Sequence, residues 1–279
     1  MSGIGVPGDG AVIAETAMAP DVRSFSPRRS PFSWLLEREV VRYLKIWHFT
    51  IAGHIMSALL FVLVFGLALA HRIAGVSGVP YDRFIIPGLL GQAVLNVGYI
   101  NGTTSLFEAR RDRYLNDVLA SPLRWWEINL ALVLGGVIRG LLTGAGILAI
   151  AMPLTGATVH RLLVLALGAL GTLTVAGQIG VLAGAYARTL DHVYSLETLV
   201  VLPLGFLGGI FYSVSQLPPA WHVLSEVNPV FYVVQTLRIG FLGAGDIPAA
   251  MALGVLWTFA IALTVWSLLV FRSGRRLKH

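Results

Sequence analysis

The chain has 279 residues, of which 56% are hydrophobic and only 12% are charged, and its mean hydropathy is +0.77. This composition excludes a soluble globular domain, and the 31 glycines suit closely packed membrane helices better than the short alternating strands of a barrel, so an all-α membrane protein is predicted. The net charge of +6 comes from basic residues that flank the apolar runs rather than from one basic patch, so no nucleic-acid partner is expected.

The first segment, residues 1–30, is rich in glycine, alanine, serine and proline and lacks periodicity, so we expect a disordered tail. Residues 31–48 predict an amphipathic interface helix on an anionic leaflet, with its aromatic side chains at headgroup depth. Packing of this helix on a soluble partner is the alternative. Its apolar face is Phe32, Leu36, Val40, Tyr43 and Trp47, its basic face is Arg38, Arg42 and Lys45, and Trp34 is counted with its interfacial residues.

Six apolar runs follow within residues 49–272, and each can cross a hydrocarbon core, which needs ~20 residues. They are expected at about 50–71, 84–107, 128–152, 161–187, 196–212 and 249–271. Lys and Arg are concentrated in the N-terminal segment, in the loop after the second run and in the basic tail 273–279. The positive-inside rule therefore predicts a multi-pass protein whose termini are both cytoplasmic.

The only strongly charged interior segment is 108–127, which follows the second run. Its arginines cannot lie in hydrocarbon, whereas three apolar residues recur at helical spacing and need an apolar cover. A short amphipathic helix at about 108–124, offered to another protein, is the hypothesis, and a polar loop without a partner is the alternative. The arginines are Arg110, Arg111 and Arg113, and the apolar residues are Leu115, Val118 and Leu119.

The outer segment 213–248 is too long for a turn and too apolar for a solvated loop. Pro218, Pro219 and Pro229 divide it into pieces that are too short to span a bilayer. We therefore expect a re-entrant pair of helices at about 213–245, which is tolerable only where protein covers the broken backbone.

Several kinds of chemistry are not supported by the sequence. A P-loop needs a Gly-Lys-Ser/Thr run, and the only lysines, Lys45 and Lys278, each follow a leucine. Ion coupling usually needs an intramembrane acid, and the predicted spans hold none, because Asp191 and Glu197 fall at a cytoplasmic edge. The chain has no cysteine and its histidines lack ligand spacing, so no metal site is predicted.

Two features inside the apolar runs are candidates for the transport path. Arg139, within the third run, must contact an anionic group or be bound by carbonyls and amides such as Gln178 or Asn101. Aromatic residues near the outer end of the fifth run form an interface belt or a gate. The gate and path candidates are Phe206, Phe211, Tyr212, Arg139 and Gln178.

In order and spacing, the motifs of the chain resemble the permease subunit of type-2 ATP-binding-cassette (ABC-2) exporters, the family of O-antigen, nodulation-factor and daunorubicin export permeases. The resemblance runs from about Phe32 to the C-terminus, and the closest similarity is to a bacterial inner-membrane subgroup. The matching runs are Phe84-Ile-Ile-Pro87-Gly88, Leu119-Ala-Ser121-Pro122, Gly208-Gly209-Ile-Phe211-Tyr212-Ser213, Leu217-Pro218-Pro219, Asn228-Pro229 and Leu237-Arg238-Ile-Gly240-Phe-Leu-Gly243.

The resemblance implies a six-span fold with an interface helix and outer re-entrant helices, working as a dimer with two copies of a separate ATPase that binds ATP and Mg. It implies that this chain holds no cofactor, is not itself an enzyme, and contacts membrane lipids. The cargo is then an amphiphilic, lipid- or glycolipid-like molecule; a drug or small-hydrophobe exporter, an ATP-independent channel or carrier, and a non-transporting scaffold are the alternatives. The implied coupling residues are Arg110, Arg111, Arg113, Tyr114, Leu115, Val118, Leu119, Ser121 and Pro122.

Overall fold

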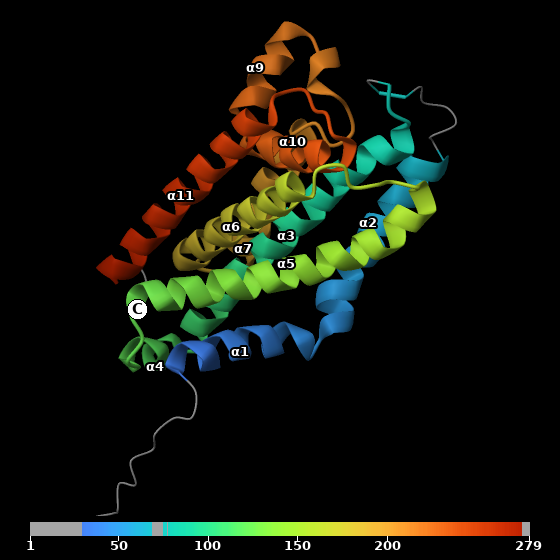
Figure 1. Cartoon of the computed structure of the whole chain (residues 1–279). Helices are drawn as coiled ribbons and strands as arrows, with labels where there is room; N and C mark the ends of the chain where they lie inside the picture. The colour runs from blue at the N-terminus through green and yellow to red at the C-terminus, as the bar shows by residue number, and fades with distance from the viewer. Residues whose placement is uncertain (1–29, 69–74, 77, 275–279) are drawn as a thin grey trace, which may run out of the picture.

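The computed structural model describes residues 30–68, 75, 76 and 78–274, and its regular elements are helices (Figure 1). The disordered tail and the last five residues of the basic tail that the sequence predicts lie outside these ranges. The α-helices are α1 (Pro31–Leu44), α2 (Gly53–Phe61), α3 (Tyr81–Arg111), α4 (Leu115–Ala120), α5 (Trp125–Thr155), α6 (Leu162–Tyr186), α7 (Leu190–Leu196), α8 (Leu202–Leu207), α9 (Pro219–Val227), α10 (Pro229–Leu242) and α11 (Ala249–Ser273).

Six helical stretches of the described chain are long and apolar enough to cross a membrane, as predicted. The first and fifth are composite, because π-helical turns interrupt them: η1 (His48–Ala52) and η2 (Val62–Ala68) flank α2, and η3 (Glu197–Val201) joins α7 to α8. The fifth stretch is Leu190–Leu207, so it begins six residues before the predicted 196–212. We call these six stretches spans 1 to 6 in chain order.

The centre of the bundle is the packing of α3 on α6, which is close because glycines face backbone on both helices. A Cβ on Gly102 would lie 2.6 Å from the Gly177 carbonyl, and one on Gly184 would lie 2.7 Å from the Thr103 carbonyl. A Cβ on Gly180 would fall on the Tyr99 carbonyl. Small residues thus let the two backbones touch, which is how membrane helices associate without a hydrophobic drive between them.

The segment after span 5 forms the end of the molecule that carries α9, here called the α9 end (Figure 1). Pro229 begins α10, and the Asn228 side chain caps it by accepting from the Val230 amide at 2.9 Å. Gly243, with φ of 77°, ends α10. Residues 230–241 of α10 are buried, whereas α9 is largely exposed, so the chain itself covers the α10 half of the expected re-entrant pair and leaves the α9 half open.

At the opposite end, here called the α4 end, α1 lies beside the first half of α5 and close to α4 (Figure 1). Both α3 and α5 have 31 residues, which corresponds to a length of about 46 Å and exceeds a hydrocarbon core of about 30 Å. Each helix is therefore longer than the core is thick, and α1 packs on the first half of α5 at the α4 end.

Candidate functional site

The charged segment forms a tight turn followed by α4 at the end of α3. Arg113 has a φ of 60°, a left-handed conformation that reverses the chain direction directly after α3. The Ser121 hydroxyl donates to the Val118 carbonyl at 2.6 Å, and Pro122 prevents the helix from continuing. The short helix here is Leu115–Ala120 rather than the expected 108–124, because α3 continues to Arg111 and the chain reverses at Arg113.

The face that α4 presents to solvent differs from the predicted one. Leu115 and Val118 are buried and Leu119 is partly buried, all packed in the core of the chain itself. The expectation that a second protein must cover these apolar residues is therefore wrong, because the chain's own core, including α3, supplies the cover. The exposed face is polar and consists of Arg111, Asp112, Arg113, Asn116, Asp117, Ala120 and Pro122.

The arginines of this segment have separate roles. Arg110 donates to the carbonyls of Gly184, Ala185 and Ala187 at 2.9, 2.8 and 3.2 Å, so it caps the end of α6 and is not available to a partner. Arg111 pairs with Asp112 at 2.8 Å on the surface, and this hydrogen bond lowers the pKa of Asp112. The exposed pair is worth little for stability and leaves both charges open to a partner.

A buried charge network ties α1 to this segment. The carboxylate of Glu39, which is fully buried, accepts hydrogen bonds from Arg38, Arg42 and Ser105. Arg42 also pairs with Glu108 at 3.3 Å, so the network reaches the last turns of α3. The carbon at the centre of the Arg38 guanidinium lies 3.7 Å from the Tyr114 ring centroid, a cation–π contact that reaches the turn before α4.

This network corrects the predicted orientation of α1. Arg38 and Arg42 face Glu39 inside the chain rather than an anionic leaflet, and Tyr43 is buried on α5 rather than at headgroup depth; burial raises the pKa of Tyr43 to about 12. The large apolar side chains left exposed between residues 31 and 48 are Trp34, Val41, Leu44, Ile46 and Trp47. Sequence reasoning missed Glu39, although Leu35, Glu39 and Tyr43 recur every four residues and so share one helical face.

Arg139 adjoins the same network through its contact with Asn101. Its guanidinium donates to the Thr50 carbonyl at 2.8 Å and to Asn101 Oδ1 at 3.5 Å, as one of the two expected modes of binding describes. Thr50 is the third residue of span 1, so Arg139, in the middle of α5, joins span 3 to the start of span 1. Gln178 is not its partner, because Gln178 donates to Asn129 at 3.1 Å.

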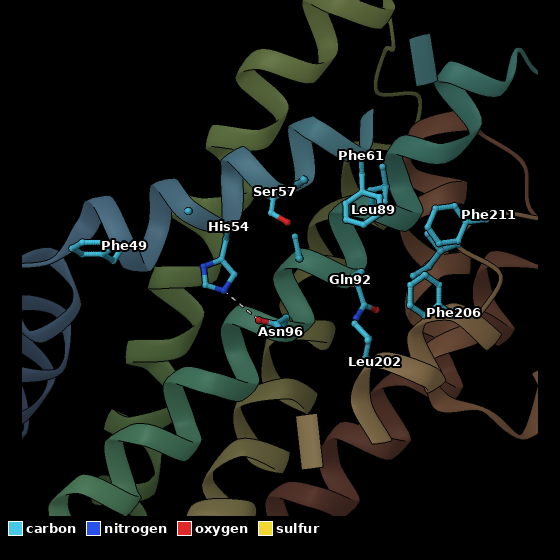
Figure 2. A pocket seen from close by; sticks show the side chains of 14 residues that line it. Phe49, His54, Ser57, Phe61, Leu89, Gln92, Asn96, Leu202, Phe206 and Phe211 are labelled. Carbon is cyan, nitrogen blue, oxygen red and sulfur yellow. Dashed lines mark hydrogen bonds between the residues drawn. The ribbon is translucent and has the colours of Figure 1, made fainter. Parts of the chain in front are cut away.

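A pocket of about 390 Å³ lies between span 1, α3 and α8 (Figure 2). Polar side chains collect along its middle, and His54 Nε2 contacts Asn96 Oδ1 at 3.2 Å. Phe206 and Phe211 stack with ring centroids 5.4 Å apart and form one end together with Phe61. The polar lining residues are His54, Ser57, Gln92 and Asn96.

The structure therefore brings two predicted gate residues, Phe206 and Phe211, to one pocket. Tyr212 is not among its lining residues, because its hydroxyl donates to the Leu207 carbonyl at 3.1 Å and holds the end of α8. Gln92 and Asn96, which lie four residues apart on α3, were missed because nothing in the sequence indicated which face of the second span would meet span 5.

Glu197 corrects the expectation that the spans hold no acidic residue. Because span 5 begins at Leu190, Glu197 lies about 10 Å of helical rise inside it. Its carboxylate accepts a hydrogen bond from the Asn96 side chain, so it lies next to the pocket. The predicted boundary at 196 places Glu197 at an edge, whereas the structure places it inside span 5. The lack of an intramembrane acid therefore no longer disfavours ion coupling.

Comparison with known proteins identifies the family. Residues 30–242 match the model of the ABC-2 type transporter family. The chain is 35% identical over 243 residues to the inner membrane transport permease YadH of Escherichia coli (strain K12), an alignment that covers 86% of this chain and 94% of the relative. It is 24% identical over 238 residues to nodulation protein J of Rhizobium meliloti (strain 1021), covering 82% of this chain and 89% of the relative. The chain thus belongs to the ABC-2 transporter family and is a membrane permease of that family.

Proposed function

We propose that this chain is the membrane permease of an ATP-driven exporter in a bacterial inner membrane. Two copies would assemble with two copies of a separate ATP-binding-cassette subunit, which binds ATP and Mg, and would move an amphiphilic molecule outward. Family membership supports an ATPase partner in general, and the name of the inner-membrane relative supports the location. The excess of Lys and Arg at the α4 end supports a cytoplasmic position for that end and for both termini.

The observation that carries this proposal is the exposed polar face of α4, anchored on a rigid support. Leu115 and Val118 anchor α4 in the core, and the cation–π contact of Arg38 with Tyr114 anchors the preceding turn. A helix anchored in this way would transmit a displacement by the ATPase to the helices on which it packs, rather than moving alone. The open charges of Arg113 and Asp117 offer an ATPase a specific electrostatic contact.

The path from α4 to the cargo runs along α3. This helix continues without interruption from the turn at Arg113 to the pocket wall, which it forms with Leu89, Gln92, Ala93 and Asn96. The distance from Arg111 to Asn96 is about 22 Å of helical rise. A movement imposed on α4 by nucleotide-driven closure of the ATPases would therefore change the width of the pocket directly.

The pocket is also where a second copy of the chain would complete the path. Only 17% of the apolar window of span 5 is buried, against 78% for α3, so a large apolar surface beside the pocket is uncovered in a single copy. Lipid covers such a surface in an isolated chain, and in the dimer that we propose the second copy covers part of it.

The coupling role of α4 is tested by reversing charge on its exposed face. We expect Asp117→Arg to reduce the amount of ATPase that copurifies with the tagged chain, and the ATPase activity of the purified fraction, by about tenfold, which corresponds to about 1.4 kcal/mol of contact energy. The matched control is Glu226→Arg, the same change on the exposed α9 at the other end of the molecule.

Both variants should insert and purify in normal amounts, because neither side chain is buried. Wild-type amounts of ATPase bound to Asp117→Arg would refute the assignment of this face. An equal loss in Glu226→Arg would show that charge reversal anywhere disturbs assembly and would equally remove the support for α4.

A further inference from the structure

Glu197 is the only acidic side chain in the six described spans that lies more than four residues from a span end. It is partly exposed, and it forms no ion pair with any cationic side chain of the described residues. Arg139, the cation within span 3, is bound to the Thr50 carbonyl and to Asn101 instead. A carboxylate in a membrane span without a counter-charge is costly, and such groups usually serve a ligand or pathway.

The immediate partner of Glu197 connects it to the pocket. Asn96 donates its amide N–H to Glu197, so its Oδ1 is the atom that faces His54 Nε2, and Nε2 must then carry the proton. These two hydrogen bonds use the Oδ1 and Nδ2 atoms of Asn96 and so fix the orientation of its side chain. Glu197 is thereby held at the polar part of the pocket by a residue that lines it.

Gln92 lies further along the pocket. The side-chain carbonyl oxygen of Gln92 is buried and has no hydrogen-bond partner among the described residues, although Gln92 lines the pocket. The Gln92 amide packs directly on Gly205 of α8, where a Cβ would fall on it. Figure 2 shows Gln92 between Asn96 and the pair Phe206 and Phe211. The polar stretch of the pocket thus offers the negative charge of Glu197, whereas the Gln92 oxygen faces the backbone of α8.

Beyond Gln92, one end of the pocket is aromatic. Phe65 lies 5.2 Å from Phe211 between ring centroids, and Phe211 stacks on Phe206, so the wall continues beyond the lining residues. The volume of about 390 Å³ is that of a site for a small organic molecule or the end of a lipid. A molecule that fills the pocket is therefore apolar over most of its length and donates hydrogen bonds from one end.

We propose that this pocket selects amphiphiles with a cationic amine, whose ammonium group binds next to Glu197 and Asn96 and whose apolar part lies against Phe206 and Phe211. An ammonium supplies the positive charge that Glu197 lacks, and its N–H groups can donate to the Glu197 carboxylate. The inference rests on the proposed function for its meaning in transport, and it names the class of cargo. Binding itself needs no ATPase partner.

The experiment measures binding of two matched fluorescent probes to the full chain in phosphatidylcholine nanodiscs. One probe is monodansylcadaverine, which ends in a primary ammonium, and the other is its N-acetyl derivative, which is neutral. We expect the chain to bind the cationic probe at least about tenfold more tightly than the neutral one. Glu197→Gln should remove this preference, and Glu197→Asp should keep part of it.

Two controls make the result specific. Glu226→Gln, on the exposed α9, removes a carboxylate that does not line the pocket and should leave the preference unchanged. Phe206→Ala should weaken both probes to a similar degree, because it removes an apolar contact and no charge. The Glu197 variants must purify as the parent does, and if Glu197→Gln fails to fold, Glu197→Asp and Phe206→Ala still separate charge from apolar contact.

Equal binding of the two probes by the parent chain would overturn the proposal in favour of a purely apolar site, and no binding of either would overturn it as well. A preference that survives Glu197→Gln would place the cation elsewhere. Recovery of the ATPase is scored separately on the same preparations, so failure of the cation site and failure of the exporter assignment give different results.

Discussion

Glu39 is the residue on which the docking of α1 depends. It is fully buried between α1, α3 and α5, and a Cβ on Gly135 would lie 2.9 Å from the Glu39 Cβ, so α1 and α5 touch at this point. Three donors converge on its carboxylate, two of them arginines. Removing one partner of a buried charged group leaves the others desolvated without compensation, which costs more than the contact itself is worth.

We therefore predict that Glu39→Gln releases α1 from the bundle. Hydrogen bonds to charged groups contribute about 1.5–3 kcal/mol each, and about 1.4 kcal/mol shifts an equilibrium tenfold. Because the chain has no cysteine, Leu35→Cys gives a single buried thiol on α1. Its labelling by a water-soluble maleimide should become at least about tenfold faster in the Glu39→Gln background.

The control for this measurement is Glu37→Gln on the exposed side of the same helix, which should label like the Leu35→Cys parent. Equal labelling rates for the Glu39 and Glu37 variants would show that the network does not hold α1 in place.

The close contact between α3 and α6 depends on glycines, of which Gly180 is one. Gly180→Ala would place a methyl group on the Tyr99 carbonyl, and neither backbone can yield without separating the helices. We predict a loss of about 1–3 kcal/mol and a fall in the melting midpoint in detergent of about 2–10 °C. Gly254→Ala in α11 is the control, since nothing lies within 4 Å of its Cβ position, and it should be neutral or stabilising.

A melting midpoint of Gly180→Ala equal to that of Gly254→Ala would mean that the α3 and α6 backbones do not touch as described. The comparison is clean because the two changes are chemically identical and both lie inside long helices. The difference between them therefore reports tertiary packing rather than intrinsic helix propensity.

Elements also mark the limit of what the sequence predicts. Hydropathy located the six spans because an apolar run of ~20 residues has few alternatives, and prolines located α9 and α10. The predicted orientations of α1 and α4 were wrong, because periodicity shows that each helix has two faces but not which face packs on the rest of the protein. Arg38 and Leu115 both turned inward, because buried partners such as Glu39 decide the matter and these are set by tertiary contacts.

The predicted start of span 5 was also wrong, and this misplaced Glu197. Span 5 begins at Leu190 and not at 196, because Thr189 caps α7 by accepting from the His192 amide at 3.3 Å. This shift of about two turns moved Glu197 from the edge into the span and with it the candidate cation site. Phe206 and Phe211 were predictable as aromatic residues near one span end, but their pairing with Gln92 and Asn96 required the fold.

At the scale of the whole molecule, two regions are linked by one helix. The exposed face of α4 lies at one end of α3, and the pocket lined by Gln92 and Asn96 lies about 22 Å further along it. The α9 end is fastened separately, because Asp246 accepts from Ser213 and Gln235 and pairs with Arg238 at 3.5 Å. In the mechanism that we propose, a movement of α4 would reach the pocket through α3 while the α9 end keeps its place.

The central claim is that the chain works as a pair driven by a separate ATPase. The most direct test is native mass spectrometry of the complex that the tagged chain recovers from its own inner membrane, with the ATPase activity of the same sample. We predict a mass of two 30.0 kDa chains and two ATP-binding-cassette subunits, with ATP hydrolysis. A chain recovered alone, without associated ATPase activity, would contradict the claim and favour a self-sufficient carrier or channel.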